Sequence, residues 1–164
     1  MRPDQLLALL LDCHREKFAL LARHEAGARA VGLYDVNNTY QYVIAREEAH
    51  VAWLTDAIQA LAGTLPEAAE AAQPKSGRGA PADVAREVAA EDAKLEQAFV
   101  DRWRGRVEAV TNARHKVMLR LILGEMLEHT RFFEQAAAGR SDLLGRRPDG
   151  AGTGGGVLQT RWVE

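Results

Sequence analysis

The chain has one cysteine among its 164 residues, and this scarcity excludes several classes of site. Cys13 has no partner for an internal disulfide, and no Cys-x-x-Cys element is present for structural zinc, rubredoxin-type iron or dithiol redox chemistry. Because Cys13 lies among leucines, we expect its thiol to be a buried apolar group. The sequence thus excludes sites built on paired thiolates.

Long apolar runs and an excess of charge of one sign are also missing. The longest apolar run, Leu6–Leu11, is far shorter than the roughly 20 residues of a membrane-spanning helix, and no basic leader segment precedes it. The 21 Lys and Arg residues nearly balance the 23 Asp and Glu residues, for a net charge of -2. We therefore expect a cytoplasmic protein that binds neither nucleic acid nor membrane.

Alternating β-branched patterns are absent too, and helical periodicity dominates four stretches of the chain. Capping residues, glycines and prolines predict where each helix begins and ends. The four helices are expected from Pro3-Asp4 to about Gly32, from a cap at Asn37 or Asn38 to Gly63, from a cap at Asp83 to Gly105 or Val110, and from Thr111-Asn112 to Gly139.

The segments between and after these helices divide the chain. Residues 63–82 are rich in Pro and Gly and form a connector long enough to run the length of a helix, which would make the second and third helices parallel. We expect one bundle over residues 1–140, followed at 141–164 by a Gly-rich linker and a docking tail. The apolar tail residues are Val157, Leu158, Trp162 and Val163.

Polar residues interrupt the apolar stripes of the helices. In the second helix Glu47 and His50 fall on the stripe with Tyr40, Val43 and Leu54, and their spacing of three residues places both on one face. The fourth helix carries Glu125 and His129 on its own stripe, four residues apart. A core carboxylate costs several kcal/mol unless it is paired, neutralised or bound to a cation, so these positions predict a metal site.

With carboxylates and imidazoles on facing helices, the chain resembles the ferritin-like superfamily, in particular rubrerythrin-like and bacterioferritin-like di-iron proteins. The sharpest element is Glu47-Glu48-Ala49-His50, followed by Val51-Ala52-Trp53-Leu54. The resemblance implies an all-α, ferritin-like four-helix bundle with a long crossover between the second and third helices. It also implies two iron or manganese ions per subunit, with Glu47 bridging them and His50 as a terminal ligand. Haem does not carry over, because Glu48 stands where bacterioferritins have a methionine ligand.

For the remaining ligands, more than one residue is possible in each helix. The first helix offers Glu25 or Glu16, and two apolar stripes compete there; the third offers Glu91, or else Asp92 or Glu96 if this helix ends later. In the fourth helix Glu125 or Glu128 would bridge beside His129. We expect His14, His24 and His115 at the surface or in supporting positions. The predicted ligand set is therefore Glu25, Glu47, His50, Glu91, Glu125 and His129.

Two classes of function follow from this interpretation. The first is a di-iron or di-manganese oxidoreductase, expected as a homodimer, that acts on peroxide, dioxygen or ferrous iron and takes electrons from a separate donor. The second is a ferritin-like bundle that has lost part of its ligands and serves as an oligomerisation or regulatory module. The irregular spacing of Glu125 and His129 motivates the second class.

Overall fold

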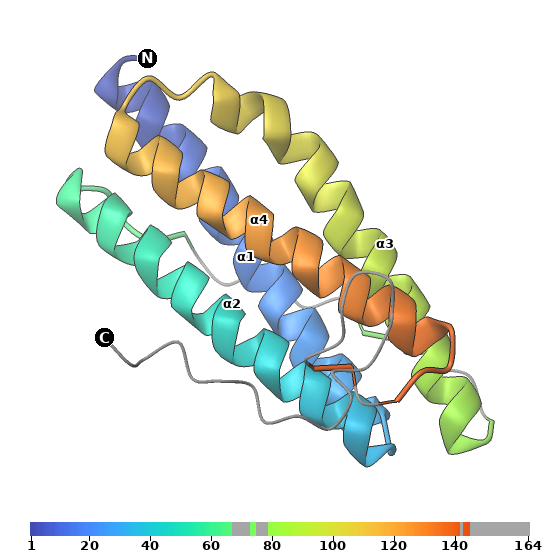
Figure 1. Cartoon of the computed structure of the whole chain (residues 1–164). Coiled ribbons are helices and arrows are strands. Elements are labelled where there is room, and N and C mark those ends of the chain that lie inside the picture. Colours follow the sequence, from blue (N-terminus) through green and yellow to red (C-terminus); the bar gives the residue numbers. More distant parts are fainter. Residues whose placement is uncertain (67–72, 75–78, 142, 145–164) are drawn as a thin grey trace, which may run out of the picture.

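Four long helices make up most of the described chain and pack as a bundle (Figure 1). The computed structural model describes residues 1–66, 73–74, 79–141 and 143–144. No strand occurs among these residues, which confirms the predicted all-α four-helix fold. The helices are α1 (Pro3–Ala30), α2 (Tyr34–Ala60), α3 (Pro81–Glu108) and α4 (Ala113–Ala137).

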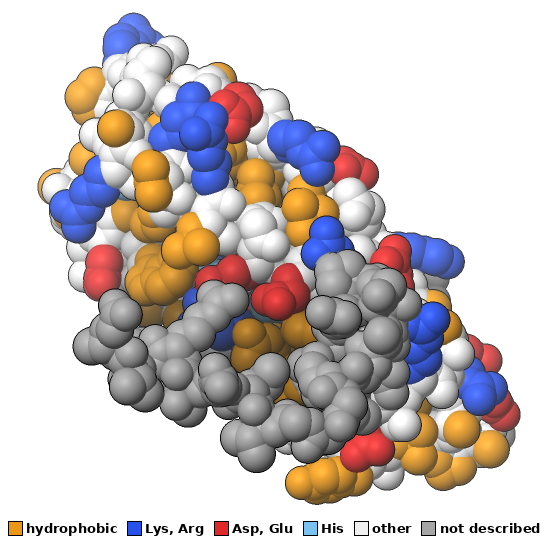
Figure 2. Space-filling view, in the orientation of Figure 1, with side chains coloured by type: hydrophobic (Ala, Val, Ile, Leu, Met, Phe, Trp, Pro, Cys, Tyr) orange, Lys and Arg blue, Asp and Glu red, His pale blue; other side chains and the backbone are white. Residues whose placement is uncertain are grey.

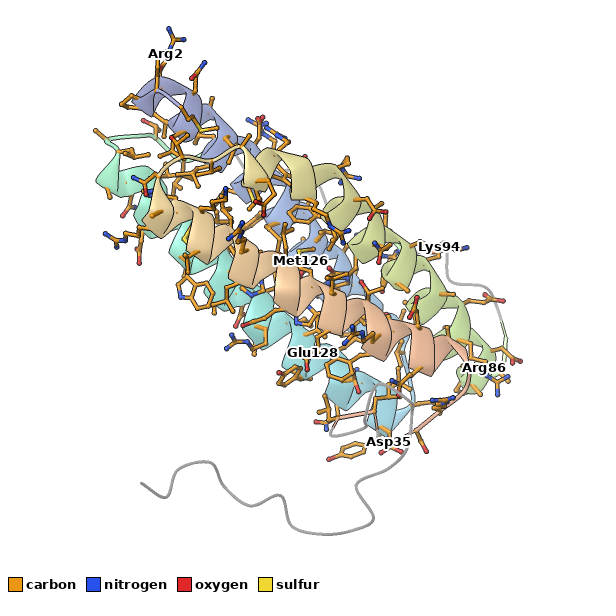
Figure 3. The ribbon with its side chains drawn as sticks, turned by 45° about the horizontal axis from the view of Figure 1, so that its top comes forward. Arg2, Asp35, Arg86, Lys94, Met126 and Glu128 are labelled. Atoms are coloured by element: carbon orange, nitrogen blue, oxygen red, sulfur yellow. The ribbon has the colours of Figure 1, made fainter. Side chains whose placement is uncertain are left out.

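The second and third helices run in the same direction. Asp35 near the start of α2 and Arg86 near the start of α3 lie at one end of the bundle, whereas Arg2 lies at the other (Figure 3). The connector between α2 and α3 therefore joins opposite ends of the bundle, as the predicted crossover requires. Residues 67–72 and 75–78 of this connector lie outside the described residues.

Two helix starts differ from the prediction. The second helix begins at Tyr34, so Asn37 is helical; its side-chain amide donates to the carbonyl of Ala28, 2.6 Å away, and ties the turn to α1. The third begins at Pro81, whose fixed φ suits the first helical position, and Asp83 lies in its first turn. Both helices are longer than the capping residues indicated.

The other helix ends follow the sequence. The third helix passes Gly105 and ends at Glu108, between the two predicted ends at Gly105 and Val110. Asn112 then caps α4 by accepting from the backbone N–H of His115. After α4, Gly139 adopts a φ of 76°, a left-handed conformation that glycine reaches at little cost.

The core has two apolar clusters with a polar layer between them. One cluster packs Leu20, Leu54, Phe99 and Met126 at its inner edge, one from each helix. The other contains Ala28, Val43, Ala93 and Phe132, again one from each helix. The polar layer includes five fully buried ionisable side chains: Lys17, His24, Glu47, Glu96 and His129.

The surface and the C-terminal segment complete the fold. On the face in Figure 2, basic and acidic side chains are interspersed. No helix in the described ranges is long and apolar enough to cross a membrane. Leu143 follows α4 and is buried in the second cluster. The rest of the linker and tail predicted at 141–164, from residue 145 on, lies outside the described residues.

Candidate metal centre

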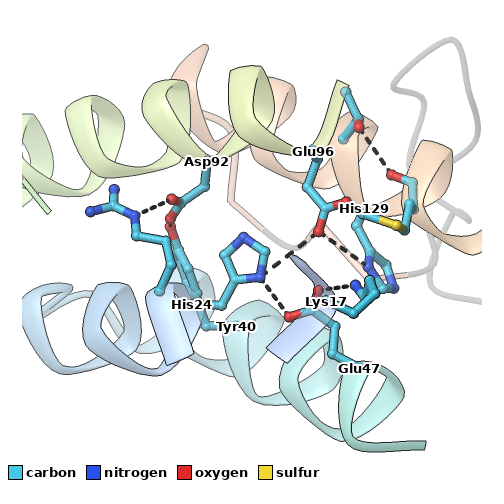
Figure 4. A network of polar contacts seen from close by, with 10 residues as sticks. Lys17, His24, Tyr40, Glu47, Asp92, Glu96 and His129 are labelled. Atoms are coloured by element: carbon cyan, nitrogen blue, oxygen red, sulfur yellow. Dashed lines mark hydrogen bonds and ion pairs between the residues drawn. The ribbon is translucent and has the colours of Figure 1, made fainter. Parts of the chain in front are cut away.

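Five ionisable side chains from all four helices meet at mid-length of the bundle (Figure 4). Lys17 and His24 come from one face of α1, two turns apart. Glu47, Glu96 and His129 come from α2, α3 and α4, and all five side chains have no exposed area. We call these five residues the central cluster.

Glu47 connects the two α1 residues. One carboxylate oxygen, Oε1, accepts a hydrogen bond from the Lys17 ammonium, and the other, Oε2, lies 2.6 Å from Nδ1 of His24. Burial by itself would raise the pKa of Glu47, but the charges of His24 and Lys17 outweigh it and hold that pKa well below its usual range. Each oxygen of this carboxylate thus faces a different basic group.

The contacts with carboxylates also shift the pKa values of Lys17 and His24. Burial alone would lower the pKa of Lys17 and of His24, but the charges of Glu47 and Glu96 raise both above their ordinary values. Lys17 therefore remains an ammonium in the interior. His24 has its other ring nitrogen, Nε2, without a hydrogen-bond partner.

Glu96 and His129 differ from the other members of the central cluster because their side chains make no hydrogen bond at all. Neither carboxylate oxygen of Glu96 and neither ring nitrogen of His129 has a hydrogen-bond partner. Glu96 Oε1 lies 3.8 Å from His24 Nδ1 and 3.8 Å from His129 Nδ1, which is too long for hydrogen bonds. Buried polar atoms are nearly always hydrogen-bonded, so these atoms indicate an interaction with a further group.

These donors are arranged as they would be around one metal ion. His24, Glu47 and Glu96 each offer an atom within 4.8 Å of the other two, and His129 adds a second imidazole. Ligands bound at about 2.0–2.2 Å stand roughly 3–4 Å apart, close to the observed 3.8 Å separations. The residues present therefore fit a single ion held by His24, Glu47 and Glu96, with His129 standing next to Glu96 as a further imidazole.

The cluster is poorer in carboxylates than a two-metal set. Such a set takes one Glu from each of two helices and a Glu-x-x-His pair from each of the other two. Three residues before His129 stands Met126, a buried thioether at mid-length of α4 (Figure 3). The first helix contributes Lys17 and His24 in place of an acid. The described residues thus bring two carboxylates to this point, Glu47 and Glu96.

Of the six ligands predicted from the sequence, Glu47 and His129 lie in the central cluster, and His50 and Glu125 lie beside it. His50 is fully buried, its ring stacks on His129 with centroids 6.1 Å apart, and its Nε2 lies 2.9 Å from Glu125 Oε2. Glu125 also accepts from Arg46 Nε at 2.9 Å, and this pair is partly exposed. Arg46, Glu125 and His50 therefore form a path from the surface to His129.

The predicted ligands Glu25 and Glu91 lie away from the central cluster. Glu25 is half-buried and lines a depression on the outer side of α1 and α2 with Asn37 and Gln41. Glu91 accepts from Arg23 at 3.0 Å at the edge of the bundle. The structure thus brings Glu96, and not Glu91, from the third helix to the level of Glu47.

Three further acids that the sequence offered as ligands also lie outside the central cluster. Glu16 accepts from Arg102 at 2.8 Å and from the indole of Trp103 at 3.1 Å, and Glu128 is exposed. Asp92 is buried next to the cluster, where it accepts from Arg23 at 2.7 Å and from the phenol of Tyr40. Both oxygens of Asp92 are occupied in this way, so its ion pair with Arg23 has a structural role.

Lys17 and His24 were the residues that the sequence did not indicate as part of the site. Both lie on one stripe of α1 with Leu10, Cys13 and Leu20. Lysine is usually exposed, so this stripe looked less apolar than its neighbours. The sequence feature that could have identified them is their spacing of seven residues, which places two basic side chains on one face of a helix.

Comparison with known proteins supports the fold alone. No family model matches the chain, and no curated protein matches it. A crystal structure of a conserved hypothetical protein, rv2844, from Mycobacterium tuberculosis is similar in fold, with a TM-score of 0.68. The match covers 85% of this chain and 95% of that chain at 19% sequence identity. The four-helix arrangement is therefore shared with a protein of known structure.

Proposed function

We propose that this chain is a ferritin-like metal-binding protein that holds one divalent transition-metal ion between His24, Glu47, Glu96 and His129. The observation that carries this proposal is Glu96, a fully buried carboxylate whose two oxygens have no hydrogen-bond partner. A buried carboxylate that makes no hydrogen bond is costly, and a bound cation offsets that cost.

The mixture of ligands limits the choice of metal. Imidazole together with carboxylate suits zinc, iron, manganese or cobalt, whereas magnesium and calcium favour oxygen donors throughout. Cys13 lies one turn before Lys17, but burial raises the pKa of its thiol to about 12, so it is not a thiolate ligand. We therefore expect the affinity of the site for divalent metals to follow the order that is usual for nitrogen and oxygen ligands, in which manganese binds more weakly than iron and iron more weakly than cobalt.

The residues around the site would define its chemistry. Phe99 and Phe133 are buried in the apolar clusters on the two sides of the central cluster and exclude bulk water. A bound iron or manganese ion would supply electron transfer to a small oxidant such as peroxide or dioxygen. The two-metal oxidoreductase with a separate electron donor stays a prediction, and it requires ligands beyond the two buried carboxylates of the central cluster.

A metal-free bundle with a structural or regulatory role is the second candidate. Its support is the charge balance of the central cluster, in which the basic Lys17 and His24 match the acidic Glu47 and Glu96. The raised pKa of His24 favours its protonated form, and the cluster would then be neutral without a metal. In the first candidate Glu96 binds a metal ion, whereas in the second it only balances the positive charge of the cluster.

Metal content and thermal melting separate these candidates. The metal-free protein is reconstituted anaerobically with Fe²⁺, Mn²⁺ or Zn²⁺, and the bound metal is counted by elemental analysis. At a free metal concentration one hundred times Kd, binding adds about 2.7 kcal/mol, which corresponds to a rise in Tm of about 5–10 °C for a chain of this size. We expect one ion per chain together with such a rise.

The variants Glu96→Gln and Glu91→Gln form a matched pair on one helix. We expect Glu96→Gln to lose the ion and the rise in Tm, and Glu91→Gln to keep both, because Glu91 lies at the edge of the bundle with Arg23. No bound ion in the unmodified chain, with Glu96→Gln less stable than it, would instead favour the metal-free bundle. Two ions per chain would favour the two-metal enzyme.

A further inference from the structure

Lys17 is a lysine enclosed completely in the interior of the bundle. Its side chain has no exposed area, and its ammonium donates to Glu47 Oε1. The ammonium also stands 5.8 Å from the centroid of the Phe99 ring, and its charge acts on Glu96 and on His50. Enclosed ammonium groups are rare unless they are paired, and the carboxylates of Glu47 and Glu96 favour a positive charge at this position.

The two oxygens of Glu47 divide this region into two positions. Oε2 faces His24, which together with Glu47 and Glu96 fits one ion, and His129 stands next to Glu96. Oε1 faces the Lys17 ammonium. His50 lies one turn after Glu47 on the same face of α2, and its Nδ1 is buried without a hydrogen-bond partner. A carboxylate that uses both oxygens on two adjacent cations is what a two-ion centre requires of a bridging ligand.

We propose that the ammonium of Lys17 occupies the second cation position of this centre and limits the protein to one metal ion. This inference rests on the proposed metal site, because the first position is the one between His24, Glu47, Glu96 and His129. An ammonium is held by a covalent tether and does not change oxidation state, so the centre is confined to the chemistry of one ion.

A carboxylate at position 17 would reverse this arrangement. In Lys17→Glu the fixed positive charge is removed and a ligand is added next to Glu47 Oε1 and His50. The matched control is Lys94→Glu, which makes the same change of charge on an exposed lysine that projects from the outer side of α3 (Figure 3). Lys94 lines a surface depression of about 490 Å³ that shares no residue with the central cluster.

Titration with Co²⁺ counts the ions that each protein binds. The end point of the visible absorption of bound cobalt is expected at one equivalent for the unmodified chain and for Lys94→Glu, and at two equivalents for Lys17→Glu. A folded Lys17→Glu protein that binds fewer than two ions overturns the role of Lys17. If the unmodified chain binds none while Lys17→Glu binds two, the proposed one-metal function fails and the ammonium position stands.

A neutral variant keeps the inference testable if Lys17→Glu does not fold. Lys17→Met has a similar length without the charge, and removing a positive charge next to a bound cation strengthens cation binding. We expect the dissociation constant for Co²⁺ to fall at least tenfold in Lys17→Met and to stay unchanged in Lys94→Met. An unchanged or weaker affinity in Lys17→Met would show that Lys17 only fills space in the core.

Discussion

At the scale of single residues, the imidazole of His50 makes stability depend on pH. Burial, followed by the charge of Lys17, lowers the pKa of this ring from 6.5 to about 4. The unfolded chain therefore binds a proton more readily than the folded chain between these two values, and stability falls as the pH drops through this window. At 1.36 kcal/mol per pH unit, the metal-free protein should lose about 2 kcal/mol between pH 7 and pH 5 through His50.

The variant His50→Gln removes this ring and keeps an amide that can donate to Glu125. We expect its free energy of unfolding, measured with urea, to fall by about 2 kcal/mol less than that of the unmodified protein over the same change of pH. The comparison is needed because burial also lowers the pKa of His14 and of His115, which add their own decline. Equal declines in both proteins would mean that His50 is accessible to protons in the folded state.

At the level of single residues, the candidate site could be located only in part from the sequence. Glu47 and His50 were assigned to the core correctly, because the stripe of α2 is unambiguous and both are fully buried. The choice of Glu96 depended on where α3 ends, and this helix runs past Gly105 to Glu108 with Glu96 buried on it. In α1 the apolar residues nearly encircle the helix, so periodicity alone did not identify the face that carries Lys17 and His24.

At the scale of the helices, Gly27 sets how closely α1 approaches its neighbours. A Cβ at Gly27 would stand 2.9 Å from Tyr40 Cε1 and 3.1 Å from Asp92 Oδ2, and the hydrogen bond between these two side chains prevents an easy shift. We expect Gly27→Ala to lower the free energy of unfolding by about 1–3 kcal/mol, as other overpacked cores do.

The control for this prediction is Gly124→Ala in α4, where an added Cβ meets nothing within 4 Å. Alanine is the better helix former, so this variant should gain about 0.5–1 kcal/mol. Urea unfolding of both variants checks the pair, and a stabilised Gly27→Ala protein would mean that α1 has room to move away. The helices themselves were predictable from periodicity, whereas this close contact depends on a side chain from α2 and another from α3.

At the scale of the whole molecule, the arrangement of the bundle follows from the lengths of its connections. The short turn after α1 and the one before α4 make antiparallel pairs, and these pairs pack most closely. The long connector between α2 and α3 was sufficient to predict that they run in parallel. What the sequence could not supply is the axial level at which the four helices meet, and that level decides which acids share the central layer.

Leu143, which follows α4, packs against one end of the bundle. This side chain is 1% exposed and packs in the same cluster as Val36, Ala85 and Ala136, which come from three helices. Replacing a buried leucine with alanine removes apolar contacts and leaves a cavity, and we expect Leu143→Ala to lower the free energy of unfolding by about 2–3 kcal/mol. For a chain of this size the loss corresponds to a fall in Tm of roughly 4–12 °C.

Leu65→Ala is the matched control, because Leu65 is 40% exposed, and its Tm should stay within about 2 °C of the unmodified protein. A fall in Tm for Leu143→Ala no larger than that of the control would mean that the residues after α4 dissociate from the bundle in solution.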